Sequence, residues 1–139
     1  MKGVFALILV LAGCAVVPAP ENNAAVIVSS AGELGHFTVQ IFGDDRVVIS
    51  RHTGIPGEPG PQRQVIAGAY ARALDVVRSN GPAALAAAGP DVPPCLAWGN
   101  DIVRADPPLP EFDMFMRECP SPALTRLMAE VLAAVPVRP

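Results

Sequence analysis

The chain has 139 residues, with ten lysines and arginines against thirteen aspartates and glutamates, and a formal net charge of −3 at pH 7. This mild acidity excludes non-specific nucleic-acid binding, because that mode requires clustered positive charge to displace counterions from phosphates. The length suits a single domain of ordinary size.

The chain opens with a pattern typical of bacterial export signals. Lys2 supplies a positive charge, and the run from Val4 to Leu11 is apolar and uncharged. At about 1.5 Å of helical rise per residue, this run is too short to cross roughly 30 Å of hydrocarbon. We therefore expect a cleaved signal peptide over residues 1–13, with a short transmembrane anchor as the alternative.

The residues that end this run, Leu11-Ala12-Gly13-Cys14, resemble the lipobox of bacterial lipoproteins. The resemblance implies cleavage before Cys14 and acylation of its sulfur and its new amino group, for example by palmitate. Two or more chains anchor a protein stably, since each buried CH₂ contributes about 0.8 kcal/mol. Ala15 stands where an aspartate often marks retention in the inner membrane of enterobacteria, which favours the outer membrane. The implied location is the bacterial cell envelope, facing the periplasm.

The chain contains three cysteines. With Cys14 lipidated, Cys95 and Cys119 remain, and two cysteines in an exported chain predict one disulfide. Closing a loop of about 24 residues would stabilise the fold by roughly 3 kcal/mol on the chain-entropy model. A redox pair and a metal pair are the alternatives, but the spacing is not Cys-x-x-Cys and no supporting ligands accompany it. We predict no metal site and no cofactor.

Residues 14–34 are small, polar and rich in turn formers, which predicts a flexible tether between the lipid and the folded domain. Within this stretch, Ala24 to Val28 is an alternative short edge strand. We expect a single α+β domain over residues 35–139.

The first part of this domain is expected to be a hairpin. Residues 37–41 alternate apolar and polar side chains, and residues 46–51 are rich in β-branched residues. Gly43-Asp44-Asp45 between them predicts a turn. Thr53 to Pro61 combines several prolines and glycines, which predicts an exposed loop without regular structure.

Helical periodicity follows the loop. An apolar stripe over Gln62 to Ser79 predicts a helix, and Asn80-Gly81 predicts its end. Pro82 to Ala88 predicts a second, short helix with proline in its first turn.

The second half is expected to begin with another strand pair. Strand segments are predicted over residues 95–98, 102–105 and 112–119, with a stiff proline loop over residues 107–110. Antiparallel pairing around this loop places Ile102 opposite Phe112 and brings Cys95 within about one residue of Cys119. The predicted register therefore supports the disulfide.

The last helix has the clearest signals. Ser121 is a cap, Pro122 lies in the first turn and Pro136 ends the helix. Its apolar stripe consists of Leu124, Leu127, Met128, Val131, Leu132 and Val135. The predicted fold is a small two-layer α+β domain of ββαββα order, with helices packed on one face of an antiparallel sheet.

Candidate catalytic groups are few. His36 and His52 are the only imidazoles, and no close histidine pair or His-Glu-x-x-His pattern appears. Ser50 and His52 share a strand face, but their Cβ atoms lie about 6 to 7 Å apart and no nucleophile elbow accompanies them. We therefore predict no catalytic residues.

Four acids surround the second predicted hairpin: Asp101, Asp106, Glu111 and Asp113. They are similar to the carboxylate pairs of glycosidases. Because scattered loop acids are usually solvated, they motivate only an alternative function.

Two elements are candidates for partner contact. Trp98, the sole tryptophan, either packs against the predicted disulfide or, exposed with Tyr70 or Phe115, anchors a partner. The proline-rich loop, with Ile55 and Pro56, is the other element, since such a loop loses little entropy on binding.

These features together predict a lipid-anchored cell-envelope lipoprotein that binds an envelope protein as a non-enzymatic accessory or inhibitor. The membrane contact is the lipid anchor on Cys14, and no nucleic-acid partner is expected. The alternative is a small envelope hydrolase that uses the carboxylates near the second hairpin. A ligand carrier ranks third, because alanine-rich helices pack close to a sheet and leave little room.

Overall fold

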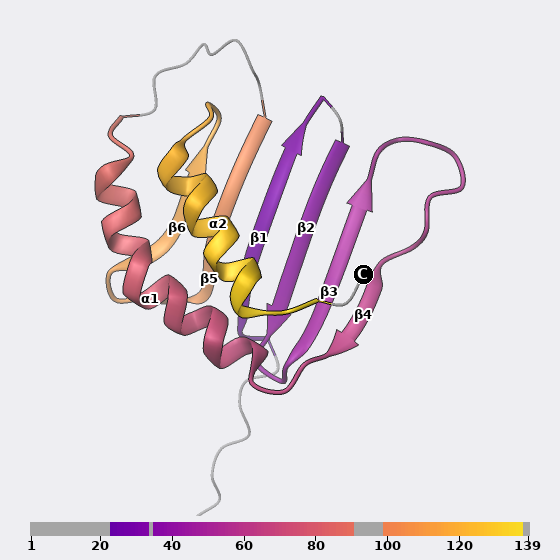
Figure 1. The fold of residues 1–139 in the computed structure, drawn as a ribbon, viewed down its shortest axis with the longest axis horizontal. Helices are drawn as coiled ribbons and strands as arrows, with labels where there is room; N and C mark the ends of the chain where they lie inside the picture. The colour runs from indigo at the N-terminus through magenta and orange to yellow at the C-terminus, as the bar shows by residue number, and fades with distance from the viewer. Residues whose placement is uncertain (1–22, 34, 91–98, 138–139) are drawn as a thin grey trace, which may run out of the picture.

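The computed structural model describes residues 23–33, 35–90 and 99–137. These residues form one antiparallel sheet of six strands, in the order β4-β3-β2-β1-β5-β6, and two helices. Both helices lie on the same face of the sheet (Figure 1). The predicted α+β class and antiparallel sheet are therefore confirmed. The order of elements is not: four strands, rather than two, precede the first helix, giving ββββαββα.

The strand β1 (Ala25–Gly32) lies in the centre of the sheet. It pairs with β2 (Gly35–Phe42) on one side and with β5 (Gly99–Leu109) on the other. Val26 and Val28 are fully buried. The prediction of a tether through residue 34 is thus wrong. The alternative strand predicted over Ala24 to Val28 does form, but it is a central strand and not an edge strand. A short apolar run has the same sequence pattern in an edge strand and in a central strand. The two are distinguished only by whether other strands pair with it on one side or on both.

The predicted first hairpin is confirmed. β2 and β3 (Arg46–His52) pair antiparallel around a turn in which Asp45 adopts a positive φ of 65°. Asp45 also joins this turn to the start of α1 (Ala69–Ala87). Its carboxylate accepts hydrogen bonds from the backbone N–H of Gly68 at 2.7 Å and of Tyr70 at 3.1 Å. These bonds satisfy donors that a helix start leaves unpaired.

The predicted helix boundaries in the middle of the chain are wrong. Residues Gln62–Val65 form the strand β4, which pairs with β3. The α1 helix starts only at Ala69 and continues through Asn80-Gly81 and Pro82 to Ala87. Gly81 is buried against the ring of Phe112, where a Cβ atom would lie 2.5 Å from Phe112 Cδ2. Close packing therefore requires a glycine inside the helix at a position where sequence alone indicates a stop.

The second hairpin forms with a different register from the one predicted. β5 runs through the prolines to Leu109, and Leu109 lies opposite Phe112, the first residue of β6 (Phe112–Arg117). Ile102 pairs with Met116 and not with Phe112, because β5 continues through the prolines to a tight turn at Pro110-Glu111. The register also shifts between Arg104 and Leu109. The cross-strand argument for the disulfide is therefore lost, and that prediction rests on the cysteine count.

The last helix, α2 (Pro122–Ala134), confirms its predicted signals. Ser121 Oγ accepts a hydrogen bond from the backbone N–H of Leu124 at 3.4 Å, and Pro122 is the first helical residue. The two helices contact each other, with Arg72 Nε donating to the Ala134 carbonyl at 2.8 Å. The core lies between the helices and the sheet, and its largest fully buried side chains are Phe115, Ile41, Leu124, Leu127, Val26, Val28, Val39, Val47, Val77, Val103, Val131 and Val135.

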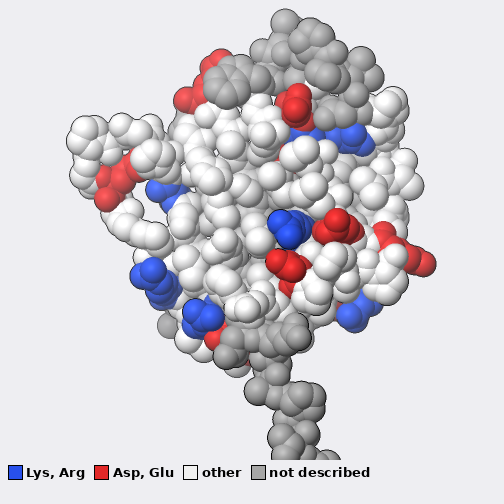
Figure 2. Space-filling model, turned by 180° about the vertical axis from the view of Figure 1, so that it is seen from behind, with Lys and Arg blue, Asp and Glu red and all other residues white. Residues whose placement is uncertain are grey.

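The helices cover only part of the sheet. In Figure 1 they lie over β6, β5 and β1, whereas β3 and β4 extend beyond them. The opposite face, here called the open face, carries no helix in the described part of the chain, and charged side chains of both signs are scattered over it (Figure 2). The β3–β4 side is therefore the part of the helix-side face that is left for contacts.

The contact between Gly81 and Phe112 gives a prediction with an unusual sign. Gly81→Ala should remove a helix penalty of about 0.5–1 kcal/mol. Overpacking against Phe112 should cost about 1–3 kcal/mol and outweigh that gain. We expect a net loss of about 1 kcal/mol in the free energy of unfolding, measured by urea denaturation.

The matched control is the same substitution in a Phe112→Leu background, where the smaller side chain leaves room and Gly81→Ala should stabilise. An increase in the urea midpoint for Gly81→Ala with Phe112 intact would contradict this packing.

Candidate partner-binding site

The loop of residues 53–61 joins β3 to β4 and protrudes beyond the sheet (Figure 1). It has no helix or strand, as predicted. Gly54 and Gly57 adopt positive φ values of 77° and 87°, which glycine tolerates without strain. The loop thus begins at the end of β3 and returns to start the terminal strand β4.

The carboxylate of Glu58 closes this loop at its base. Its Oε1 atom accepts hydrogen bonds from the backbone N–H and the hydroxyl of Thr53. Its Oε2 atom lies 3.0 Å from Nδ1 of His52. The Thr53 hydroxyl, with smaller contributions from the Thr53 N–H and His52, holds the pKa of Glu58 below its ordinary value. We call this arrangement the Glu58 clip.

The clip holds a loop that exposes an apolar side chain. Ile55 is 66% exposed, and Pro56 is exposed beside it. Both predicted contact residues therefore face solvent. Trp98, the third one, lies outside the described residues.

A hollow of about 280 Å³ lies beside the two ends of the loop. Two of its lining residues flank the loop in sequence. Arg51 precedes the loop by two residues, and Gln62 directly follows it. The floor is apolar, and the Arg51 guanidinium lies 5.8 Å from the centre of the Phe37 ring. The complete lining, here called the groove, is Phe37, Val39, Ile49, Arg51, Gln62, Leu132 and Val137.

Sequence reasoning missed the groove and the clip. The alternation of β2 and β3 places Phe37, Val39 and Ile49 on one face, which was a usable signal. The exposure of this face depends on where the helices end, and the helix ends are determined by tertiary packing. The pairing of Glu58 with Thr53 depends on loop geometry that composition does not specify.

The aromatic residues considered with Trp98 are not an exposed cluster. Phe115 is fully buried in the core, so its role as an exposed anchor is wrong. Tyr70 is partly buried against the core, and burial raises the pKa of its hydroxyl.

The two histidines lie closer than expected, because His36 and His52 are direct cross-strand partners in the β2–β3 register. They have different contacts. His36 Nε2 lies 2.9 Å from Ser29 Oγ and 2.8 Å from Thr38 Oγ1, and these hydroxyls lie 3.1 Å apart. Ser29 is only 9% exposed, so this network satisfies a buried hydroxyl between β1 and β2.

The four acids of the alternative hydrolase hypothesis are dispersed around the second hairpin. Glu111 and Asp113 are exposed, and Asp106 Oδ2 lies 3.6 Å from Arg104 Nη2. Asp101 lines a separate hollow of about 150 Å³. This arrangement differs from two carboxylates that face each other across a cleft.

The described residues contain no group of three or more histidines, cysteines, aspartates or glutamates placed to hold a metal ion. Among the described helices, none has the length and apolar character needed to cross a membrane. Cys14 and Cys95 lie outside the described residues. Cys119 has a partner and is not free, and the Cys95–Cys119 pairing stays a prediction.

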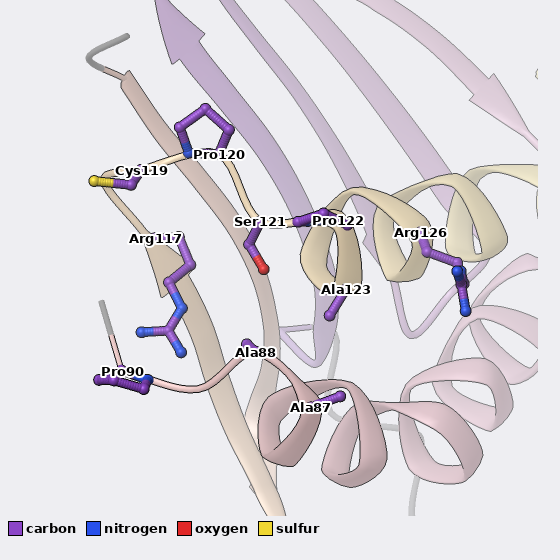
Figure 3. Close-up of a pocket in the computed structure, with 10 residues that line it drawn as sticks. All are labelled: Ala87, Ala88, Pro90, Arg117, Cys119, Pro120, Ser121, Pro122, Ala123 and Arg126. Atoms are coloured by element: carbon purple, nitrogen blue, oxygen red, sulfur yellow. The ribbon is translucent and has the colours of Figure 1, made fainter. Parts of the chain in front are cut away.

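A second hollow, of about 510 Å³, lies between the end of α1 and the start of α2 (Figure 3). Two of its polar side chains, Ser121 and Arg117, are already used within the fold. Ser121 caps α2, and the Arg117 guanidinium donates to the carbonyl of Gly89. We therefore assign the partner contact to the loop and the groove.

Comparisons of the chain with protein-family models, with curated proteins and with solved structures find no match. Any function must therefore be argued from the site itself.

The Glu58 clip should depend on pH. Because the pKa of Glu58 is lowered in the folded protein, the clip contributes its full stability above the ordinary value of 4.5 and loses it as the pH falls further. The backbone amide resonance of Thr53, followed by NMR, should shift only below that value. In Glu58→Ala, the Thr53 amide should resonate at neutral pH at the chemical shift that the wild-type protein reaches only in acid.

Glu111→Ala, which removes an exposed acid in another turn, is the matched control and should leave the Thr53 resonance unchanged. A Thr53 amide that does not respond to Glu58→Ala would show that the clip does not form in solution.

Proposed function

We propose that this protein is a lipid-anchored lipoprotein of the bacterial cell envelope that binds an envelope protein through the 53–61 loop. It acts as a non-enzymatic accessory or inhibitor. The observation that carries the binding part is the Glu58 clip, which closes a loop that exposes Ile55 and whose two ends adjoin the groove. The anchor is carried by the lipobox resemblance at Leu11-Ala12-Gly13-Cys14.

A clipped loop is suited to binding because association costs ordering entropy. A loop that is already held in one shape has less of this cost to meet. Ile55 supplies apolar area at the loop, and the groove supplies an apolar floor next to it.

The position of the loop relative to the proposed anchor also supports this function. Gly32, at the end of β1, pairs with Gly35, and the neighbouring His36 pairs with His52 at the start of the loop. The loop is thus at the opposite end of the sheet from Ala25. The twelve residues from Cys14 to Ala25 span at most about 40 Å even when fully extended. With the proposed anchor at Cys14, the Ala25 end of the sheet is the end attached to the tether, and the loop lies at the other end.

The dispersed carboxylates of the second hairpin favour a binding role over the alternative hydrolase. The outer membrane as destination and a Cys95–Cys119 disulfide belong to the same proposal. The outer membrane is favoured by Ala15, and the disulfide follows from export, because disulfides form and persist in oxidising compartments.

The anchor is tested by Cys14→Ser. Cells fed an alkyne-labelled palmitate should label the wild-type protein, and the variant should lose both the label and the membrane fraction. Cys95→Ser, which keeps the proposed lipidation site, is the matched control and should retain the label. Label that persists in Cys14→Ser, or a purified native chain that still begins with Met1, would refute lipidation.

Partner binding is tested with a photocrosslinking amino acid placed at Ile55 in intact cells. We expect a discrete crosslinked species at this position, and none at Leu85, an exposed apolar residue of α1. Glu58→Ala should reduce the yield several-fold, because it releases the loop. Equal crosslinking at both positions would indicate only random proximity and would contradict a specific contact.

A further inference from the structure

The terminal strand β4 has no neighbouring strand on its outer side in the described part of the sheet. Such an edge presents backbone N–H and C=O groups that another extended chain can pair with. Because β4 directly follows the 53–61 loop, a segment bound there would also lie beside the proposed contact site.

The β3–β4 edge carries positive charge on both faces, in a chain with a net charge of −3. Arg63 pairs in register with Val48 on the open face, whereas Arg51 lines the groove on the helix side. Both are exposed. Blue side chains lie along the left margin of Figure 2, where this edge falls.

Arg51 and Arg63 belong to the arginines without a carboxylate partner in the described residues, together with Arg72, Arg78, Arg117 and Arg126. Arg46 lies 2.6 Å from Asp44 and Arg104 lies 3.6 Å from Asp106. In the described residues, Arg51 contacts the Phe37 ring and no ion pair joins Arg51 or Arg63 to a carboxylate. The other terminal strand, β6, carries both charges, with the exposed acid Asp113 near its start and Arg117 at its end.

The charge discriminates between two occupants of this edge. In an antiparallel pairing with a second copy centred on Arg63, the two Arg63 side chains would lie opposite each other, and like charges across a strand pair are destabilising. An acidic strand would place a carboxylate beside Arg63. Charged residues on edge strands commonly prevent self-association. Arg63 therefore disfavours a second copy of this chain and favours an acidic strand.

We propose that the partner contributes an extended acidic segment that pairs with the outer edge of β4 as a seventh strand. Its carboxylates face Arg63 on the open face, beside the apolar side chain of Val65, which is 77% exposed. Its apolar residues face the groove side of the sheet. The inference rests on the proposed function and names the chemical class of its partner.

The test uses a fluorescein-labelled dodecapeptide of alternating glutamate and valine, titrated into the purified full-length protein and followed by fluorescence anisotropy. A peptide with lysine in place of glutamate tests the charge requirement. A peptide with N-methyl groups on alternate backbone nitrogens tests strand pairing, because it cannot donate along one edge.

We expect the glutamate peptide to bind, and the lysine and N-methyl peptides to bind at least tenfold more weakly. Binding should weaken with salt, since exposed charges are screened. Arg63→Glu should reduce the affinity of the glutamate peptide at least tenfold and improve that of the lysine peptide. Arg126→Glu on α2 changes the net charge equally and should change neither affinity.

Three outcomes would overturn the proposal: no binding of the glutamate peptide, equal binding to Arg63→Glu and Arg126→Glu, or equal binding of the N-methyl peptide. If the peptide titration gives one of these outcomes but crosslinking at Ile55 persists, the partner binds through the loop without adding a strand. If neither the peptide binds nor Ile55 crosslinks, the proposed partner binding fails as well.

Discussion

The pairing of β1 with β2 on one side and with β5 on the other holds the two halves of this protein together. Strands β2, β3 and β4 come from the first half, and β5 and β6 from the second. Only β1 joins them into one sheet whose single face the helices can cover. The burial of Val26 and Val28 under the helices is the packing consequence of that position. The first described strand therefore starts at Ala25, eleven residues after Cys14.

The position of the helices follows from contacts that are distant in sequence. Asp45 holds the start of α1 at the β2–β3 turn, and the Gly81–Phe112 contact holds its second half against the hairpin of β5 and β6. The α1 helix therefore runs from the β2–β3 turn toward the second hairpin, with α2 packed beside it. This arrangement leaves the helix-side face of β3 and β4 without a helix packed on it, and the groove forms there. The site is thus a consequence of incomplete coverage, and the loop is anchored at the margin of that uncovered area.

Local signals predicted some elements and failed for others. The last helix was predictable because Ser121 and Pro122 are cap and first-turn residues whose effect is local. Asn80-Gly81 is an equally strong local signal for a helix end, yet a distant ring, that of Phe112, determines that the helix continues. Residues 62–65 became a strand because β3 was available for pairing. At the site, loop composition predicted the exposure of Ile55 and Pro56, whereas the Glu58 clip, the groove and the charge of the β4 edge required the fold.

The central position of β1 is tested most directly by amide hydrogen exchange. The account predicts that the backbone amides of residues 26–28 exchange as slowly as those of Val39 and Val103, because all of them exchange only when the sheet opens. Amides of residues 26–28 that exchange at the rate of an unfolded chain, while those of Val39 and Val103 stay protected, would contradict it. In that case the N-terminal stretch would be a tether, and the sheet would lack the strand that joins its halves.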